Sequence, residues 1–441
     1  YEVVPNMTKQ IPSTVSMPEV SYTSVSDVHQ INKSVKPQRE FINAQLFVII
    51  ISVVQGLTEI CGFSTFYYQK DDLKLEPQFI QLLAGIIGFP FCIKPVFGYI
   101  SDKLVNRLKG TKYIIITTSI IRIIGFSIVA HYRTGVLVFH MFIFINCLCA
   151  LFENIIAEYM LVVSTKEENE RNGDSKGNHL PYYYGFRACG SLVGTFSGGR
   201  IYYWYGGPTS FFICSFLPII SIFSALAYKE KPIVVDESER RDFKTEVSIM
   251  KQLLMKDKVL MLIVFICLIN ATPNFDMLIS FYMTDYLKFT SEDLSNFSAF
   301  ATVCYILGLV LYTMYFKDIE KKKFYISTNF MLWFCNVSFL LVITKTLDAW
   351  HINNKIFCML SRGVTSFIAE LNFMPILAIW CSICPKNLEA TSITLFTGLI
   401  NFSGNFSNYF GSFVLWGMGI RKDSFGEMWK PIVLQNSYLL I

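Results

Sequence analysis

Charged residues are scarce in this chain of 441 residues: they make up 16% of it, whereas hydrophobic residues make up 53%. A soluble domain carries roughly 25% charged residues. A deficit of this size over so long a chain indicates that much of the protein surface faces something other than water. Residues 1–41 also lack the apolar segment of a signal peptide and are polar throughout. We expect these residues to form a disordered cytoplasmic N-terminal tail.

The sequence also lacks the motifs of several enzyme classes. No GxxxxGK[ST], HExxH or GxSxG pattern occurs, so nothing supports ATP-driven pumping or hydrolysis. The net charge is only +5, and the basic residues lie in short clusters between apolar runs, which argues against nucleic-acid binding. The 12 cysteines show no CxxC…CxxC spacing, and we interpret them as small apolar residues. The sequence therefore predicts no enzyme activity, no metal site and no cofactor.

What the sequence does contain is a series of long apolar runs. A bilayer core about 30 Å thick takes about 20 helical residues to cross, and backbone polar groups in lipid must be bonded within a helix. The runs lie near residues 42–68, 78–101, 113–131, 136–163, 182–204, 208–228, 258–284, 294–316, 324–346, 352–383, 388–417 and 429–441. They predict an all-α membrane protein with about twelve transmembrane helices, the last of them incomplete.

Basic residues are concentrated in alternate connections between these runs. The connections around 103–112, 229–257 and 317–323 together hold 15 of the 38 Lys and Arg residues, and the connection with Arg421 and Lys422 is the exception. Because cytoplasmic loops are enriched in Lys and Arg, we expect the N-terminus to be cytoplasmic. The polar stretch 229–257 then forms a cytoplasmic central loop between two six-helix halves, residues 42–228 and 258–441.

The two halves show weak internal similarity. Small residues repeat every four positions in the fifth run, from Gly190 to Gly198, and in the eleventh run, from Ser403 to Gly411. Such stripes are typical of close helix packing. Two parallel six-helix repeats around a polar site at the membrane midplane are the architecture of the major facilitator superfamily. This fold makes a solute transporter the natural expectation.

A charge inside a transmembrane helix is costly and needs a reason. The candidates are Glu59, Lys94, Arg122, Glu153, Glu158, Arg187, Asp276, Arg362 and Glu370. The fourth run holds the densest polar group, in which Glu153 and Asn154 precede Glu158. Because a buried carboxylate can exchange a proton near neutral pH, Glu158 and Glu153 are candidates for proton coupling.

Two interpretations of Glu158 stay open. It either carries a proton or accepts from N–H groups of a substrate, or it forms a structural ion pair with Arg187 or Lys94. The two overlap, because an ion pair that opens on binding can couple a substrate to a conformational change. Arg187 can hold a carboxylate with two hydrogen bonds. Lys94 precedes Pro95, whose helix break frees backbone groups that can line a cavity.

The remaining charges are assigned from their positions. Glu59 and Asp276 lie in the first runs of the two halves and are candidate cavity residues. Arg122 lies deep in the third run and either pairs or extends to the interface. We expect Arg362 and Glu370 to form a pair near a helix end.

A short segment before the first basic connection contains two residues that suit a cytoplasmic gate. Gly98 and Asp102 lie four residues apart in GYISDK. A glycine permits close helix approach, and Asp102 can cap or pair at a cytoplasmic gate. The segment resembles the first half of the major facilitator loop signature Gly-x-x-x-Asp-(Arg/Lys)-x-Gly-Arg-(Arg/Lys), whereas residues 105–107 depart from its second half.

Several segments in the same order resemble the folate–biopterin transporter family of the major facilitator superfamily. They are YYQKDDLKLEP, GFPFCIKPVFGYISD, GFRACGSLVGTFSGG, FMPILAIWCSICPKNLEAT and the closing FGEMWKPIVLQNSYLLI. Phe91 stands where the family usually has Trp. The family's Asp-x-x-x-Asp pair of the fourth helix falls on Asn154 and Glu158, so one carboxylate is replaced by an amide.

The resemblance implies a secondary active transporter for folates, folate precursors or pterins that works by alternating access, with protons as an option for coupling. Lys94 and Arg187 would then hold the substrate's carboxylates, and Glu158 would accept from pterin N–H groups or carry a proton. Asn154, Asp276 and Glu59 complete the expected site. A facilitator for another organic anion or small nutrient, or a non-transporting receptor of the same fold, is the alternative. We expect a multi-pass monomer, with the plasma membrane as the default location and an organelle membrane as the other choice.

Overall fold

The computed structural model describes residues 44–108, 110–132, 134–172, 180–229, 248, 251, 254–316, 318–383 and 389–439. The chain divides into two units, Tyr1–Phe41 and Ile42–Ile441. The tail predicted for residues 1–41 lies outside the described residues, and so does most of the central loop predicted for 229–257. Within the described ranges the structure consists of helices and connections and contains no β-strand.

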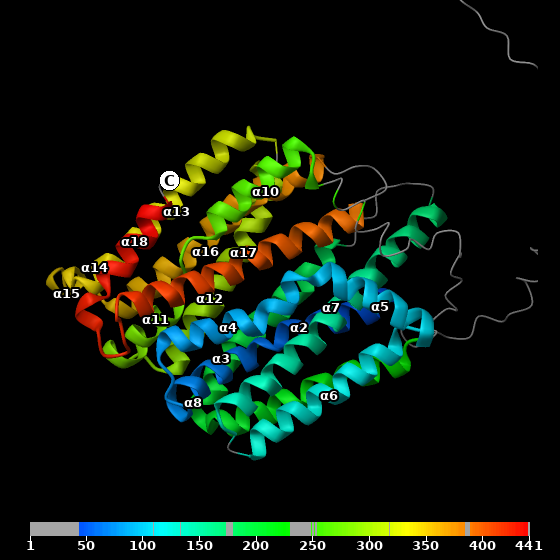
Figure 1. Cartoon of the computed structure of the whole chain (residues 1–441), viewed down its shortest axis with the longest axis horizontal. Coiled ribbons are helices and arrows are strands. Elements are labelled where there is room, and N and C mark those ends of the chain that lie inside the picture. Colours follow the sequence, from blue (N-terminus) through cyan, green and yellow to red (C-terminus); the bar gives the residue numbers. More distant parts are fainter. Residues whose placement is uncertain are drawn as a thin grey trace, which may run out of the picture. The chain divides into compact units, whose positions relative to one another are not determined.

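The first half contains helices that match the predicted runs in order (Figure 1). They are α2 (Ala44–Leu57), α3 (Glu59–Tyr67), η1 (Tyr68–Asp72), α4 (Pro77–Cys92), α5 (Lys94–Leu108), α6 (Lys112–His131), α7 (Val136–Asn172) and α8 (Leu180–Ala227). The long helix α8 is folded at Gly206, whose φ of 77° is in the left-handed region that glycine adopts without strain. Helix α8 therefore covers the fifth and sixth predicted runs.

The second half is likewise built from helices that follow the order of the predicted runs. Its elements are α10 (Asp257–Asn270), α11 (Asp276–Phe281), η3 (Tyr282–Tyr286), α12 (Ser291–Leu311), η4 (Tyr312–Phe316), α13 (Lys321–Ser338), α14 (Leu340–Ile343), α15 (Thr346–Ala349), α16 (Asn354–Ile383), α17 (Glu389–Gly417), η5 (Phe425–Glu427) and α18 (Trp429–Leu439). Helix α17 packs on α4, and α12 packs on α8, so helices of the two halves lie against each other (Figure 1).

The lengths and surfaces of these helices suit a bilayer. Seven helical segments of the described part are long and apolar enough to cross a membrane, or eight if the bent pair α4–α5 counts as one span. Large apolar side chains such as Phe223 and Phe330 are more than half exposed, as expected of side chains that face lipid. The prediction of an all-α membrane protein is confirmed, and the total of about twelve helices stays a prediction.

Three interior breaks in the described spans directly precede a charged residue. Glu59 begins α3, Lys94 begins α5 and Asp276 begins α11. The α4–α5 bend measures 49°. Pro95 and Pro273 lie at two of these breaks, because proline cannot donate a backbone hydrogen bond to the preceding turn. A carboxylate at the start of a helix also meets the positive end of the helix dipole, which favours Glu59 and Asp276 at these positions.

The small-residue stripes pack against the first segment of their own half. A methyl group on Gly190 would overlap the backbone of Val53 in α2, and one on Gly194 would meet the backbone of Gly56 at 2.9 Å. In the second half, Ser407 donates to the Thr272 carbonyl, and a methyl on Gly411 would overlap the Asn274 carbonyl. The predicted close packing is confirmed, and its occurrence at equivalent positions supports the internal repeat.

Candidate functional site

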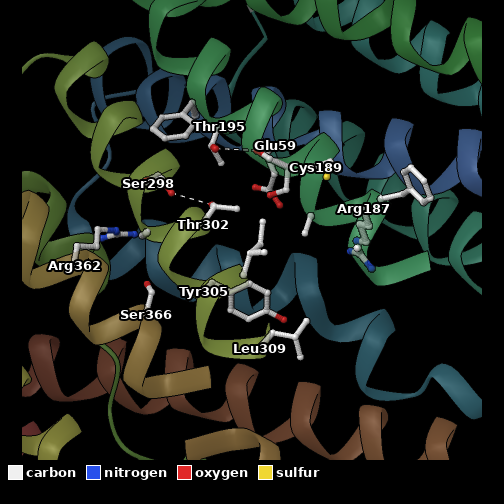
Figure 2. Close-up of a pocket in the computed structure, with 18 residues that line it drawn as sticks. Glu59, Arg187, Cys189, Thr195, Ser298, Thr302, Tyr305, Leu309, Arg362 and Ser366 are labelled. Atoms are coloured by element: carbon white, nitrogen blue, oxygen red, sulfur yellow. Dashed lines mark hydrogen bonds between the residues drawn. The ribbon is translucent and has the colours of Figure 1, made fainter. Parts of the chain in front are cut away.

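A cavity of about 910 Å³ lies between helices of the two halves (Figure 2). Its volume is at the upper end of small-molecule pockets, which measure roughly 300–1,000 Å³. Segments α2, α3 and α8 of the first half and α12 and α16 of the second half line it. The lining residues are Gly56, Glu59, Phe63, Gly185, Phe186, Arg187, Ala188, Cys189, Ser191, Thr195, Ser298, Ala301, Thr302, Tyr305, Ile306, Leu309, Arg362 and Ser366.

Three of the lining residues are charged. Glu59 and Arg187 come from the first half and Arg362 from the second. In Figure 2, Arg187 and Arg362 lie on opposite sides of the view, with Glu59 between them. Glu59 is within electrostatic range of Arg187, but none of the three forms a salt bridge within the part of the chain that the structure describes. Charges at membrane depth that form no ion pair make this cavity the candidate site.

Close backbone packing fixes the position of Arg187. A methyl group on Gly56 would overlap the carbonyl oxygen of Arg187, so α8 lies directly on α2 at this point. Glu59 follows three residues after Gly56, at the start of α3. The Gly56 contact therefore brings the cation and the carboxylate to one wall of the cavity.

The other wall is formed by one face of α12. Ser298, Thr302 and Tyr305 recur at helical spacing and line the cavity. The Thr302 hydroxyl donates to the Ser298 carbonyl at 2.9 Å, and Tyr305 is 40% exposed. With Phe63 and Phe186 on the opposite wall, Tyr305 provides aromatic surface next to the charges. Such surface stacks readily on a planar ring.

Lys94 and Glu158 form an ion pair and do not line this cavity. The Lys94 ammonium lies 2.7 Å from both carboxylate oxygens of Glu158. The side chain of Lys94 is 4% exposed, whereas that of Glu158 is 24% exposed. Of the two ion-pair partners that the sequence left open for Glu158, the structure has Lys94 and not Arg187. The roles of these two residues in binding and proton transfer stay predictions.

Glu153 is enclosed by partners. Its carboxylate lies 2.5 Å from Arg122, which pairs rather than extends to the interface, and both side chains are buried. Thr118 and Ser119 also donate to Glu153, at 3.3 and 3.4 Å. The neighbouring Asn154 donates to the Tyr183 hydroxyl, which is outside the cavity lining.

The remaining predicted residues are dispersed. Asp276 is exposed at the start of α11, where its backbone N–H donates to the Asn274 side chain at 2.7 Å. Gly98 lies in α5 with open space where a side chain would stand. Nothing is described of the Asp102 side chain, so the predicted gate falls in part outside the described residues.

The pairing predicted for Arg362 and Glu370 is not found. Arg362 is exposed to the cavity, whereas Glu370 is buried beside Tyr305. The two residues lie eight positions apart along α16, which is about 12 Å of helix rise, so they have different neighbours. Arg362 is thus a cavity residue that the sequence did not assign, because only the packing of α16 on α12 reveals which way it faces.

Comparisons with known proteins agree with this architecture. The chain is 26% identical over 393 residues to folate transporter 1 of Plasmodium falciparum (isolate 3D7), covering 87% of this chain and 75% of the relative. It is 20% identical over 396 residues to the folate-biopterin transporter of Synechocystis sp., covering 90% of this chain and 79% of the relative. These relatives carry the names of transporters and not of enzymes.

Solved structures resemble the chain in fold. The nucleoside transporter NupG superposes with a TM-score of 0.67 at 14% identity, over 90% of this chain and 99% of that one. A D-xylose-proton symporter superposes with a TM-score of 0.61 at 12% identity, over 89% and 96%. The major facilitator fold expected from the sequence is therefore confirmed. The family model described as BT1 family matches residues 55–441, and the chain belongs to that family of multi-pass membrane proteins.

Proposed function

We propose that this protein is a secondary active transporter that carries folates, folate precursors or pterins across a membrane by alternating access. The names of its relatives supply the substrate class. The observation that carries the assignment to this chain is the cavity between the halves, with two guanidinium groups, one carboxylate and aromatic surface. A folate offers matching groups: a glutamate tail with two carboxylates, and a planar pterin ring with N–H donors.

In the proposed complex, Arg187 holds a carboxylate of the substrate through paired hydrogen bonds. Glu59 accepts hydrogen bonds from the ring's N–H groups, and Phe63 or Tyr305 stacks on the ring. Because these residues come from both halves, a bound substrate is in contact with both. Substrate binding can therefore bias the relative movement of the halves that alternating access requires.

The Lys94–Glu158 pair lies outside the cavity lining. Lys94 begins α5 after the bend, and Glu158 belongs to α7, so the pair holds the bend against its neighbour. Glu158 is the partly exposed member of the pair, and loss of its charge would release Lys94. We propose that the release of Lys94 couples protons to transport and makes Lys94 available to an anionic substrate.

Two further assignments complete the proposal. We place the protein as a monomer in the plasma membrane, with an organelle membrane as the alternative. A facilitator for another organic anion remains the second candidate, since the charged groups of the cavity suit other anions as well.

Uptake by the purified protein in proteoliposomes tests the proposal. We expect saturable accumulation of labelled folate or pterin, enhanced by an imposed pH gradient, and competed by unlabelled pterins but not by sugars or amino acids. Accumulation that is independent of the pH gradient would contradict the proposed proton coupling. No uptake of any pterin compound, with uptake of another organic anion, would replace the substrate assignment.

A further inference from the structure

The cavity holds more positive than negative charge, and its two cations come from different halves. Arg187 belongs to α8 and Arg362 to α16, and Figure 2 shows them on opposite sides of Glu59 and Tyr305. Neither guanidinium has a carboxylate partner among the residues that the structure describes. A ligand with two anionic groups can supply a partner to each of these cations.

From this arrangement we infer that the cavity selects pterin compounds with two carboxylates over those with one or none. The inference rests on the proposed function and names its preferred substrate. Arg187 and Arg362 each bind one carboxylate of the tail. A doubly charged tail thereby forms an ion pair with each half, which an uncharged pterin cannot do.

A series of three ligands tests this inference: biopterin without a carboxylate, pteroate with one, and folate with two. For the unaltered protein, we expect kcat/KM for folate to exceed that for pteroate and biopterin by at least about tenfold, which corresponds to about 1.4 kcal/mol. Arg362→Gln should lower folate uptake about tenfold, to the level of pteroate, and change biopterin uptake less than twofold. Arg362→Lys should restore part of the folate uptake, because it restores the charge without the planar fork.

Arg421→Gln is the matched control, because Arg421 is an exposed arginine in the connection before η5. It should leave the uptake of all three ligands unchanged. Equal loss of all three ligands in Arg362→Gln, or an unaltered protein that carries biopterin as well as folate, would overturn the inference and leave the proposed function standing. Failure of the unaltered protein to carry any of the three would overturn the proposed function itself.

A second inference comes from a repeated turn at the ends of the first and seventh spans. Residues Tyr68–Asp72 (η1) and Tyr282–Tyr286 (η3) both form a π-helical turn. The turns share the pattern Tyr-x-x-Asp-x-Leu-Lys, and each is closed by a Leu N–H that donates to the Tyr carbonyl, at 2.9 and 3.0 Å. The lysine that follows each turn has a left-handed backbone, with φ of 52° at Lys74 and 58° at Lys288.

The two turns meet across the halves. The Lys70 ammonium of η1 lies 2.6 Å from Asp285 of η3 and 3.1 Å from Asp71 of its own turn. Its side chain is only 11% exposed and lies over the ring of Phe281. The repeat is asymmetric at this point, because the residue equivalent to Lys70 in η3 is Thr284. One half therefore supplies the cation, and the other supplies the carboxylate.

A second contact between the halves lies in the same layer. The Arg200 guanidinium of α8 donates to Asn296 of α12 at 2.8 Å and lies 3.3 Å from Glu292. A methyl group on Gly199 would overlap the Ser291 carbonyl, so the two helices touch here. This layer directly adjoins the cavity in both helices. Thr195 is the last cavity-lining residue of α8, and Ser298 is the first cavity-lining residue of α12.

We propose that the Lys70–Asp285 ion pair is a latch that closes one end of the cavity and opens during alternating access. The proposal depends on transport by alternating access but not on the identity of the substrate. The latch lies at the end of the cavity where the first and seventh spans finish, and it links the two halves at that end. Loss of either charge should therefore admit water and small reagents to the cavity from that end.

Labelling of Cys189 measures this access, because its thiol is exposed on the cavity wall. A membrane-impermeant maleimide is added to vesicles on the side of the Lys74 and Lys288 turns, and the signal lost on Cys189→Ser is taken as cavity labelling. Lys70→Gln and Asp285→Asn should each raise the labelling rate at least about threefold. The double variant should show no further increase, since both changes break one interaction.

Lys355→Gln provides the matched control. Lys355 and Asp293 form an ion pair of 2.8 Å within the second half, so its loss should not change labelling. An equal rise in Lys355→Gln would show that the effect is general loosening and would overturn the latch. Unchanged labelling in both Lys70→Gln and Asp285→Asn would overturn it as well.

Discussion

The charges at the α6–α7 interface and those of the central cavity differ in their partners. At the interface, Arg122 and Glu153 are both buried and face each other at 2.5 Å, with two hydroxyl groups completing the carboxylate's environment. In the cavity, Glu59, Arg187 and Arg362 are accessible and form no salt bridge in the described part of the chain. The first arrangement pairs its charges within the protein, whereas the second leaves its charges accessible from the cavity.

The Lys94–Glu158 pair is intermediate between these two regions. Lys94 is buried like Arg122, but Glu158 is partly exposed like the cavity charges. The comparison therefore ranks the intramembrane charges by how strongly we expect the stability of the fold to depend on them. Variants at the three places should separate stability from transport, with the largest loss of stability at α6–α7 and the smallest in the cavity.

Glu153→Ala should have the largest effect on stability. It leaves the Arg122 guanidinium buried without a counter-charge, which costs about 3 kcal/mol or more of unfolding free energy. Unfolding of the protein purified in detergent measures this loss. The double variant Arg122→Met/Glu153→Met removes both charges and should lose less stability than Glu153→Ala. Normal stability with abolished pH-dependent uptake in Glu153→Ala would instead support the proton-coupling role expected from the sequence.

Lys94→Ala should have an intermediate effect, about 1–2 kcal/mol, because the Glu158 carboxylate that it leaves unpaired can still reach water. Transport should suffer more than stability: we expect folate uptake to be abolished while the protein still inserts into the membrane. Glu158→Gln should retain the fold and lose the response to a pH gradient. Full uptake in Lys94→Ala would show that the pair has no part in transport.

The positions of the helices could be predicted from the sequence. Which side chains of each helix face the cavity, the lipid or a neighbouring helix could not. Lipid demands long apolar helices, so their approximate ranges follow from composition alone. Pro95 and Pro273 likewise mark two of the three interior breaks. The break before Glu59 has no proline, and nothing in the local sequence distinguishes Thr58 from its helical neighbours.

The site was predictable only in part, because it depends on contacts between distant segments. Glu59 and Arg187 were expected at the cavity from their cost in lipid, and the structure places both there. The same argument could not tell Lys94 from Arg187 as the partner of Glu158, since residue spacing says nothing about neighbours across helices. With 40 Phe and 23 Tyr in the chain, the sequence could not single out Phe63 or Tyr305 either. The repeated Tyr-x-x-Asp-x-Leu-Lys pattern was visible in the sequence, but only the structure shows that its two copies are in contact.

Arg187→Ala should have the smallest effect on stability and a large effect on transport. The Arg187 side chain faces the cavity without a salt-bridge partner in the described residues, so its removal should change the unfolding free energy by about 0.5 kcal/mol or less. Folate uptake should nevertheless be abolished, because the substrate loses a paired, charge-assisted contact. Unfolding and uptake measured on the same preparation decide the matter. A variant that unfolds as readily as Glu153→Ala would place Arg187 among the structural charges, and one with normal uptake would remove it from the binding site.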